Sequence, residues 1–229
     1  MTNSVLLFDI DGTLIATGGA GGRAMARAFQ DVFGFSNGLG SISMAGRTDA
    51  WIVAQMAAEH GLAYDAGRFR AFHDSYVRAL SEEVLAPGPQ KGVLPGVRRL
   101  LDTLVSRDNA YLALLTGNFM RGAQIKLEYF DLWRYFKAGA YGDDSHDRNG
   151  LLWKALAAVE SAGGPKVRPV DVTVIGDTPL DIAVAVAGGT RSIGVATGNY
   201  DVETLLESGA DVAFASLDDV DAVLNALNL

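Results

Sequence analysis

Two aspartates, Asp9 and Asp11, end a short apolar run in the segment VLLFDIDGTL, residues 5–14. Side chains alternate along a strand, so residues two apart start on the same face. Two carboxylates crowded at a strand end repel each other unless a cation lies between them. The pair predicts a hard metal ion such as Mg²⁺, with one carboxylate as nucleophile and the other as proton carrier. A solvated turn is the alternative, because Asp and Gly are common turn residues.

A second polar cluster ends the apolar run of YLALLTGN, residues 111–118. It consists of Thr116, Gly117 and Asn118. A hydroxyl group and open backbone N–H groups at a strand end can bind phosphate oxygens. The same three residues also form ordinary loops, so this cluster alone is weak evidence for a phosphate site.

A third cluster ends the apolar run of VTVIGDTPLDIAVAVAGG, residues 172–189. Asp177 is placed to complete a metal site with Asp9. Asp181 follows after Pro179, which can open a helix, and it can brace the metal site from one helical turn away. Stabilisation of the helix N-terminus is the alternative role for Asp181.

The three clusters follow strands of one predicted parallel sheet. Short apolar runs alternate with segments of helical spacing, which is typical of an α/β, doubly wound, Rossmann-like core. In such sheets ligands bind where the strands end. The predicted strands are 5–8, 111–115, 172–175, 192–195 and 212–214, and the helices between them include 97–105, 151–162 and 180–187.

About a hundred residues separate the first two predicted strands, far more than one crossover needs. Most of this interval has helical spacing, and Gly- and Pro-rich stretches flank it. We therefore expect a smaller helical cap domain at 17–88, inserted into a core of 1–16 and 89–229. A rigid helical excursion packed on the core is the alternative to a mobile cap.

Phosphoryl transfer needs a fixed cation to balance the charges of the nucleophile and the phosphate. Two candidates follow the second cluster: Arg148, in the polar stretch DDSHDRNGLL, and Lys154, within the next predicted helix. A lysine on a helix is usually solvated. Arg148 is therefore the favoured candidate, because it lies in a loop.

These motifs resemble the haloacid dehalogenase superfamily, specifically its phosphatase branch, and are similar to those of phosphoglycolate phosphatases. FDIDGTL resembles the first family motif, LLTGN the second and IGDTPLDIAVAVAGG the fourth. The resemblance implies Asp9 as nucleophile, Asp11 as acid and base, and Thr116 as phosphate ligand. It also implies that Asp177 binds the metal together with Asp9 and the backbone carbonyl of Asp11, and that a helical cap follows the first strand.

One departure from the family concerns its third motif, usually a lysine and often before proline. Here Arg148 and Asn149 stand in that place. Arginine keeps its charge and donates as a planar fork, so the charge balance is retained while the geometry differs.

Arg47 lies in the segment GRTD, where Thr48 or Asp49 can cap a helix. Similar cap segments face the active site in the family, which makes Arg47 a candidate substrate contact. A solvated surface arginine is the alternative. Gly117 and Asn118 are the other predicted substrate-binding residues.

The composition limits the remaining possibilities. The chain has 229 residues, no cysteine and a net charge of −8. It therefore lacks thiol chemistry and is a poor candidate for nucleic acid or anionic membranes. No apolar stretch approaches a membrane span, which favours a cytoplasmic protein, and the sequence leaves open a monomer or a homodimer.

Together these features predict a magnesium-dependent phosphomonoester hydrolase that acts on a small phosphorylated metabolite through a phosphoaspartate. A phosphomutase could use the same machinery. A non-catalytic receiver module also carries a phosphoaspartate, but it needs neither an Asp11 for proton transfer nor a lid. Dehalogenation is disfavoured because a leaving halide needs no proton.

Overall fold

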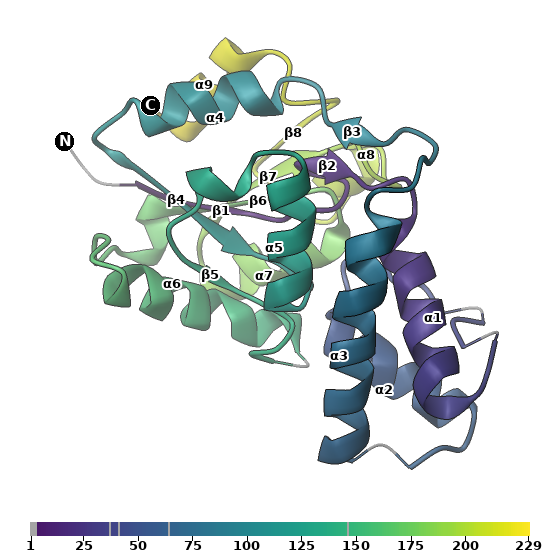
Figure 1. The fold of residues 1–229 in the computed structure, drawn as a ribbon. Coiled ribbons are helices and arrows are strands. Elements are labelled where there is room, and N and C mark those ends of the chain that lie inside the picture. Colours follow the sequence, from purple (N-terminus) through teal and green to yellow (C-terminus); the bar gives the residue numbers. More distant parts are fainter. Residues whose placement is uncertain (1–3, 37, 41, 64, 146) are drawn as a thin grey trace.

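The computed structural model describes residues 4–36, 38–40, 42–63, 65–145 and 147–229. Within these ranges the core is a six-stranded parallel sheet in the order β5-β4-β1-β6-β7-β8 (Figure 1). The predicted parallel sheet is confirmed, and β5 is a strand that was not predicted. The strands are β1 (Ser4–Phe8), β4 (Ala110–Leu115), β5 (Gly139–Ala140), β6 (Val172–Gly176), β7 (Arg191–Val195) and β8 (Val212–Phe214).

Helices cover both faces of this sheet, which explains why its central strands are apolar throughout. On β1, Leu6 and Phe8 pack into one core with α4, α5 and α9, whereas Val5 and Leu7 pack into another with α6 and α7. All four side chains are fully buried. The helices are α4 (Val97–Val105), α5 (Met120–Tyr129), α6 (Leu151–Ser161), α7 (Pro179–Gly188), α8 (Val202–Glu207) and α9 (Val220–Leu227).

Three helices between β1 and β4 form a separate unit beside the sheet (Figure 1). They are α1 (Ala20–Phe33), α2 (Asp49–Glu59) and α3 (Ala66–Glu83). This helical unit has its own apolar core, in which Phe29, Met56 and Phe72 are fully buried. At its surface, Arg23 of α1 forms an ion pair with Glu83 of α3 at 2.6 Å.

The two connections to the helical unit run side by side. They form a short antiparallel ribbon of β2 (Ile15–Ala16) and β3 (Gly92–Val93). Just beyond it, the backbones of Gly18 and Gly88 touch, and a Cβ atom on Gly88 would lie 2.4 Å from the Gly18 carbonyl oxygen. Only glycine fits at this crossing. The unit therefore enters and leaves the core through one narrow ribbon.

Truncation of the buried Phe29 should destabilise the helical unit. We expect Phe29→Ala to lower the free energy of unfolding by about 3–5 kcal/mol, because the cavity it leaves lies among fixed helices. Leu85→Ala is the control, since that side chain is 68% exposed. Urea unfolding measures both, and equal midpoints for the two variants would contradict a packed core in this unit.

Candidate active site

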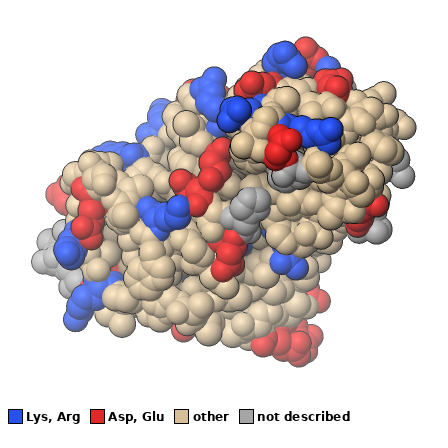
Figure 2. All heavy atoms as spheres, turned by 90° about the horizontal axis from the view of Figure 1, so that it is seen from below, with Lys and Arg blue, Asp and Glu red and all other residues tan. Residues whose placement is uncertain are grey.

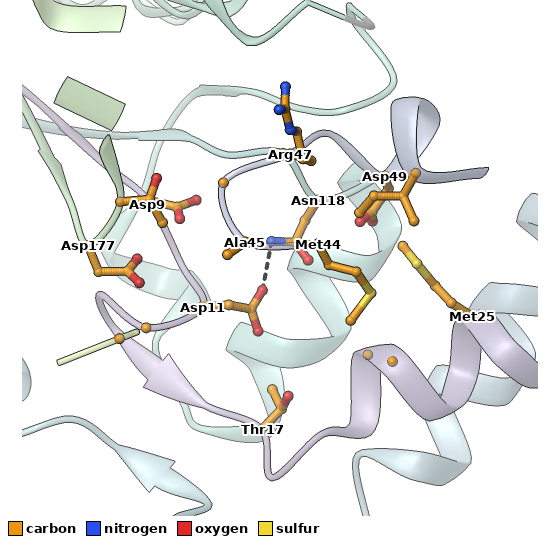
Figure 3. Close-up of a pocket in the computed structure, with 18 of the residues that line it drawn as sticks. Asp9, Asp11, Thr17, Met25, Met44, Ala45, Arg47, Asp49, Asn118 and Asp177 are labelled. Carbon is orange, nitrogen blue, oxygen red and sulfur yellow. Dashed lines mark hydrogen bonds between the residues drawn. The ribbon is translucent and has the colours of Figure 1, made fainter. Parts of the chain in front are cut away.

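The polar clusters that follow β1, β4 and β6 meet at one edge of the sheet. These three strands are direct neighbours, and all run in the same direction, so their carboxyl ends coincide. Asp9, Thr116 and Asp177 are the first polar side chains after each strand, and all three are buried. Figure 3 shows Asp9 and Asp177 facing each other across this edge.

Arg148 supplies a buried cation to this edge. It lies in a short 3₁₀ turn, Arg148–Gly150, just before α6, and is 7% exposed. Its Nη2 atom lies 3.2 Å from Oδ1 of Asp9 and also donates to Asp181, while Nη1 donates to the Gly46 carbonyl at 2.9 Å. Lys154 is exposed on α6. The structure thus brings Arg148, and not Lys154, to the sheet edge.

Asp181 is tied to Arg148 and to its own helix terminus. Its carboxylate accepts hydrogen bonds from the N–H and hydroxyl groups of Thr178, which completes a capping box at the start of α7. Ligand atoms of Asp9, Asp177 and Asp181 lie within 4.8 Å of one another. This buried group of oxygen donors can hold a hard metal ion.

Asp11 belongs to a second polar network, beside the first. It accepts hydrogen bonds from Asn118 at 2.9 Å and from Lys126 at 2.6 Å. Lys126 also donates to the side-chain oxygen of Asn118 at 2.6 Å, and Asn118 donates to the Thr116 hydroxyl at 2.9 Å. The network links the ends of β1 and β4.

Lys126 was not predicted from the sequence. It lies on α5 and is 4% exposed. A lysine on a helix normally points to solvent, and α5 itself was not predicted. The one indication in the sequence was the position of Lys126, two helical turns after the TGN cluster, on the helix that follows this loop.

Arg47 reaches the site with its backbone rather than its guanidinium group. The guanidinium carbon stacks 4.5 Å from the centre of the Trp51 ring, and the side chain is exposed and points away from Asp11 and Asn118 (Figure 3). Its carbonyl oxygen packs on Gly117, where a Cβ atom would lie 2.1 Å away. The loop before α2 therefore rests directly on the loop after β4.

A cavity of about 300 Å³ opens between the sheet edge and the helical unit. The sheet edge contributes Asp9, Asp11, Asn118, Lys126, Arg148 and Asp177. The opposite wall comes from α1, α2, α3 and the loop before α2. Its volume is at the small end of the usual range for small-molecule sites, roughly 300–1,000 Å³.

Comparisons with known proteins identify the family of the chain. Residues 6–185 match the family model of haloacid dehalogenase-like hydrolases, and residues 149–222 match a second, HAD-hydrolase-like model. The chain belongs to the haloacid dehalogenase-like hydrolases. The resemblance expected from its motifs is thereby confirmed.

Individual relatives of this hydrolase align over nearly its whole length. The probable phosphatase IndB of Dickeya dadantii (strain 3937) is 26% identical over 229 residues, which cover 97% of this chain and 94% of the relative. A solved hydrolase from Pseudomonas syringae shares the fold with a TM-score of 0.70 and 22% identity, covering 98% of this chain and 99% of that one. A "predicted phosphoglycolate phosphatase" from Haemophilus somnus 129pt has a TM-score of 0.70 and 19% identity, covering 97% and 98%.

Burial governs the charges of this hydrolase's site. It is the main reason that the pKa of Asp9 rises to about 6 and that of Asp177 to about 8; nearby carboxylates add to both effects, while Arg148 opposes them. Burial alone would lower the pKa of Arg148, but the charges of Asp181 and Asp9 raise it. One arginine thus only partly balances the carboxylates.

The raised pKa values predict a pH-dependent stability. Groups that bind protons more tightly when folded stabilise the fold at low pH, and this contribution is lost as pH rises through their folded pKa values. In chelator, the free energy of unfolding should therefore fall by several kcal/mol as pH rises from about 4, near the unfolded pKa of 3.8, to about 8, the folded pKa of Asp177. Mg²⁺ should restore it, because a cation stabilises the deprotonated carboxylates.

Asp177→Asn provides the control, because the amide has a similar shape but cannot ionise. Urea unfolding of this variant in chelator should depend less steeply on pH than that of the unmodified chain. Superimposable pH curves for the two proteins would contradict the raised pKa of Asp177.

Proposed function

We propose that the chain is a magnesium-dependent phosphomonoester hydrolase that acts on a small phosphorylated metabolite through a phosphoaspartate. The observation that carries the proposal is the buried Asp9 carboxylate, held 3.2 Å from the Arg148 guanidinium and beside the Asp177 carboxylate. An anionic nucleophile can approach an anionic phosphate only where cations balance both charges.

The chain's own groups then divide the chemistry among themselves. Asp9 attacks phosphorus, and its oxygen forms the acyl phosphate as the ester oxygen leaves. Asp11, which lines the cavity, protonates the leaving oxygen and then removes a proton from the hydrolytic water. The Thr116 hydroxyl and the backbone N–H groups of Gly117 and Asn118 bind the phosphate oxygens.

The oxygen donors fit a magnesium ion. Asp9, Asp177 and the backbone carbonyl of Asp11 would hold it, and when bound it would neutralise phosphate and carboxylate charge. The raised pKa values of Asp9 and Asp177 support this, because they indicate carboxylates whose charges lack full compensation. Asp181 already accepts hydrogen bonds from Thr178 and Arg148, which supports a bracing role.

In this proposal residues 17–88 act as a cap over a core of 1–16 and 89–229. The cap would exclude water and contact the leaving group. Its support is the cavity itself, whose wall opposite the sheet edge comes from the helical unit.

Phosphate release from p-nitrophenyl phosphate tests the proposal. Release should require Mg²⁺, stop in chelator and be abolished in Asp9→Asn, while acid-quenched turnover should leave phosphate on the peptide that contains Asp9. With a phosphomonoester that carries a second hydroxyl group, isomerisation without phosphate release would indicate a mutase instead. A phosphorylated Asp9 that never turns over would indicate a receiver module.

The cation of the site can be tested with a matched pair. Arg148→Ala should lower kcat/KM about 10²–10³-fold, because a charge that stabilises the transition state is lost. Lys154→Ala should stay within about twofold of the unmodified chain, because its side chain is exposed. Both variants need a folding check, since Arg148 is buried.

Arg148→Lys separates charge from shape. Recovery of activity would mean that the site needs only a cation, whereas no recovery would mean that the guanidinium fork positions the phosphate. An inactive Lys154→Ala beside an active Arg148→Ala would reverse the assignment.

A further inference from the structure

The end of the cavity away from Asp9 carries polar groups that the proposed chemistry does not use. Its walls are mostly apolar or small, from Gly21, Met25, Met44 and Ile52. Set among them are the carboxylate of Asp49 and the hydroxyl of Tyr76. Figure 3 shows Asp49 and Met25 on the side of the cavity opposite Asp9 and Asp177. If the phosphate group of a substrate is bound at Asp9, its leaving group would extend toward this distal end.

Asp49 presents one open acceptor to this end of the cavity. It opens α2 and is 6% exposed. Its backbone N–H donates to the Gly117 carbonyl at 2.7 Å, and its Oδ2 atom accepts the Phe119 N–H at 2.8 Å. Its Oδ1 atom has no hydrogen-bond partner among the described residues. Because Asp49 lines the cavity, a ligand bound there can donate a hydrogen bond to this oxygen.

Tyr76 presents a hydroxyl group on the same side. Its ring is fully buried and packs edge-on against Phe119. The phenol oxygen lies beside Gly122 of α5, one turn before Lys126, and no hydrogen-bond partner is found for it within the described ranges. Burial, followed by the charges of Asp49 and Asp11, holds the pKa of Tyr76 well above its usual value, so the hydroxyl keeps its proton.

The cations that line the cavity are already engaged. Lys126 is bound to Asp11 and Asn118, and Arg148 to Asp9, Asp181 and the Gly46 carbonyl. Arg47 stacks on Trp51 with its guanidinium group directed outward. The distal end therefore offers an open carboxylate acceptor and a hydroxyl. Burial raises the pKa of Asp49 to about 7, and the charge of Lys126, which is bonded to Asp11, opposes this rise.

We propose that Asp49 and Tyr76 form a leaving-group subsite that selects phosphomonoesters with neutral hydroxyl donors and rejects those with a carboxylate. A substrate hydroxyl would donate to Oδ1 of Asp49 and accept from the Tyr76 hydroxyl. A substrate carboxylate would instead face Asp49 and Asp11, where like charges repel, and the described cations that line the cavity are already paired. The inference rests on the proposed hydrolase function and distinguishes this chain from an enzyme suited to phosphoglycolate.

Three substrates with the same three-carbon skeleton test the subsite. Glycerol 3-phosphate carries neutral hydroxyls, 3-phosphoglycerate replaces one by a carboxylate, and n-propyl phosphate carries neither. The unmodified enzyme should prefer glycerol 3-phosphate over both others by about tenfold or more in kcat/KM, since a site built to bond a hydroxyl penalises its absence. Equal or faster turnover of 3-phosphoglycerate would overturn the proposal.

Variants separate recognition from structure. In Asp49→Asn, kcat/KM should fall about tenfold or more for glycerol 3-phosphate and change little for n-propyl phosphate. The ratio of kcat/KM between glycerol 3-phosphate and 3-phosphoglycerate should also decrease, because the charge that repels the carboxylate is gone. Tyr76→Phe should lower kcat/KM for glycerol 3-phosphate and leave it unchanged for the other two substrates. Asp74→Asn, at a side chain 78% exposed on α3, is the matched control and should behave like the unmodified enzyme. An equal loss on all three substrates in both variants would mean a purely structural role.

Measurements of substrate binding test the subsite independently of turnover. Calorimetry on Asp9→Asn, which should bind without reacting, should rank glycerol 3-phosphate above 3-phosphoglycerate. If this ranking holds while p-nitrophenyl phosphate is never hydrolysed, the proposed function fails and the subsite stands. If phosphate is released but the ranking is reversed, the subsite fails and the function stands.

Discussion

The ion pair between Arg148 and the carboxylates at the sheet edge is the interaction on which the site depends. Asp9, Asp177 and Asp181 crowd together because β1 and β6 are adjacent and parallel, and because α7 starts directly after β6. Burying that much like charge is costly unless a cation lies among it. Arg148 contacts two of the three carboxylates directly. Its guanidinium group therefore stabilises the folded arrangement of these carboxylates.

The position of Arg148 also links the core to the helical unit. Its Nη1 atom donates to the carbonyl of Gly46, which belongs to the loop before α2. The same loop rests on Gly117, and Asp49 is bonded to the backbone on both sides of Asn118. The sheet edge and the opposite wall of the cavity are thus joined by several hydrogen bonds. Figure 2 shows acidic and basic side chains interspersed on the face of the molecule that it presents.

Much of the core could be predicted because its strands are nearly continuous apolar runs, as in Val5–Phe8. The residues where such runs stop marked the sheet edge. Strand β5 has only two residues, Gly139–Ala140, and α5 begins at Met120 after Phe119, whose side chain cannot cap a helix. Neither element therefore carries a local signal. For the helical unit, the spacing of apolar residues predicted helices, but it did not show which side chains of these helices pack together.

Hydrogen-bond partners that are distant in sequence could not be predicted either, because no local sequence pattern indicates them. Thr13 donates to Asp177 across 164 positions, and Lys126 reaches Asp11 across 115. Such pairs follow from strand order and from a helix start, and neither leaves a mark in local spacing. Residue types indicated that Asp9, Asp11 and Asp177 belong together, but only the packing of α5 shows a lysine beside Asp11.

The division of the cavity between two parts of the chain bears on how such a hydrolase can diversify. Met25, Met44 and Ile52 belong to the inserted segment and make none of the hydrogen bonds that hold Asp9. Mutations there would change the cavity wall without removing the ion pair that holds Asp9. Asp49 differs, because it lines the cavity while also bonding the backbone at Gly117 and Phe119. A change at Asp49 would therefore also disturb the loop after β4, which a change at Met44 would not.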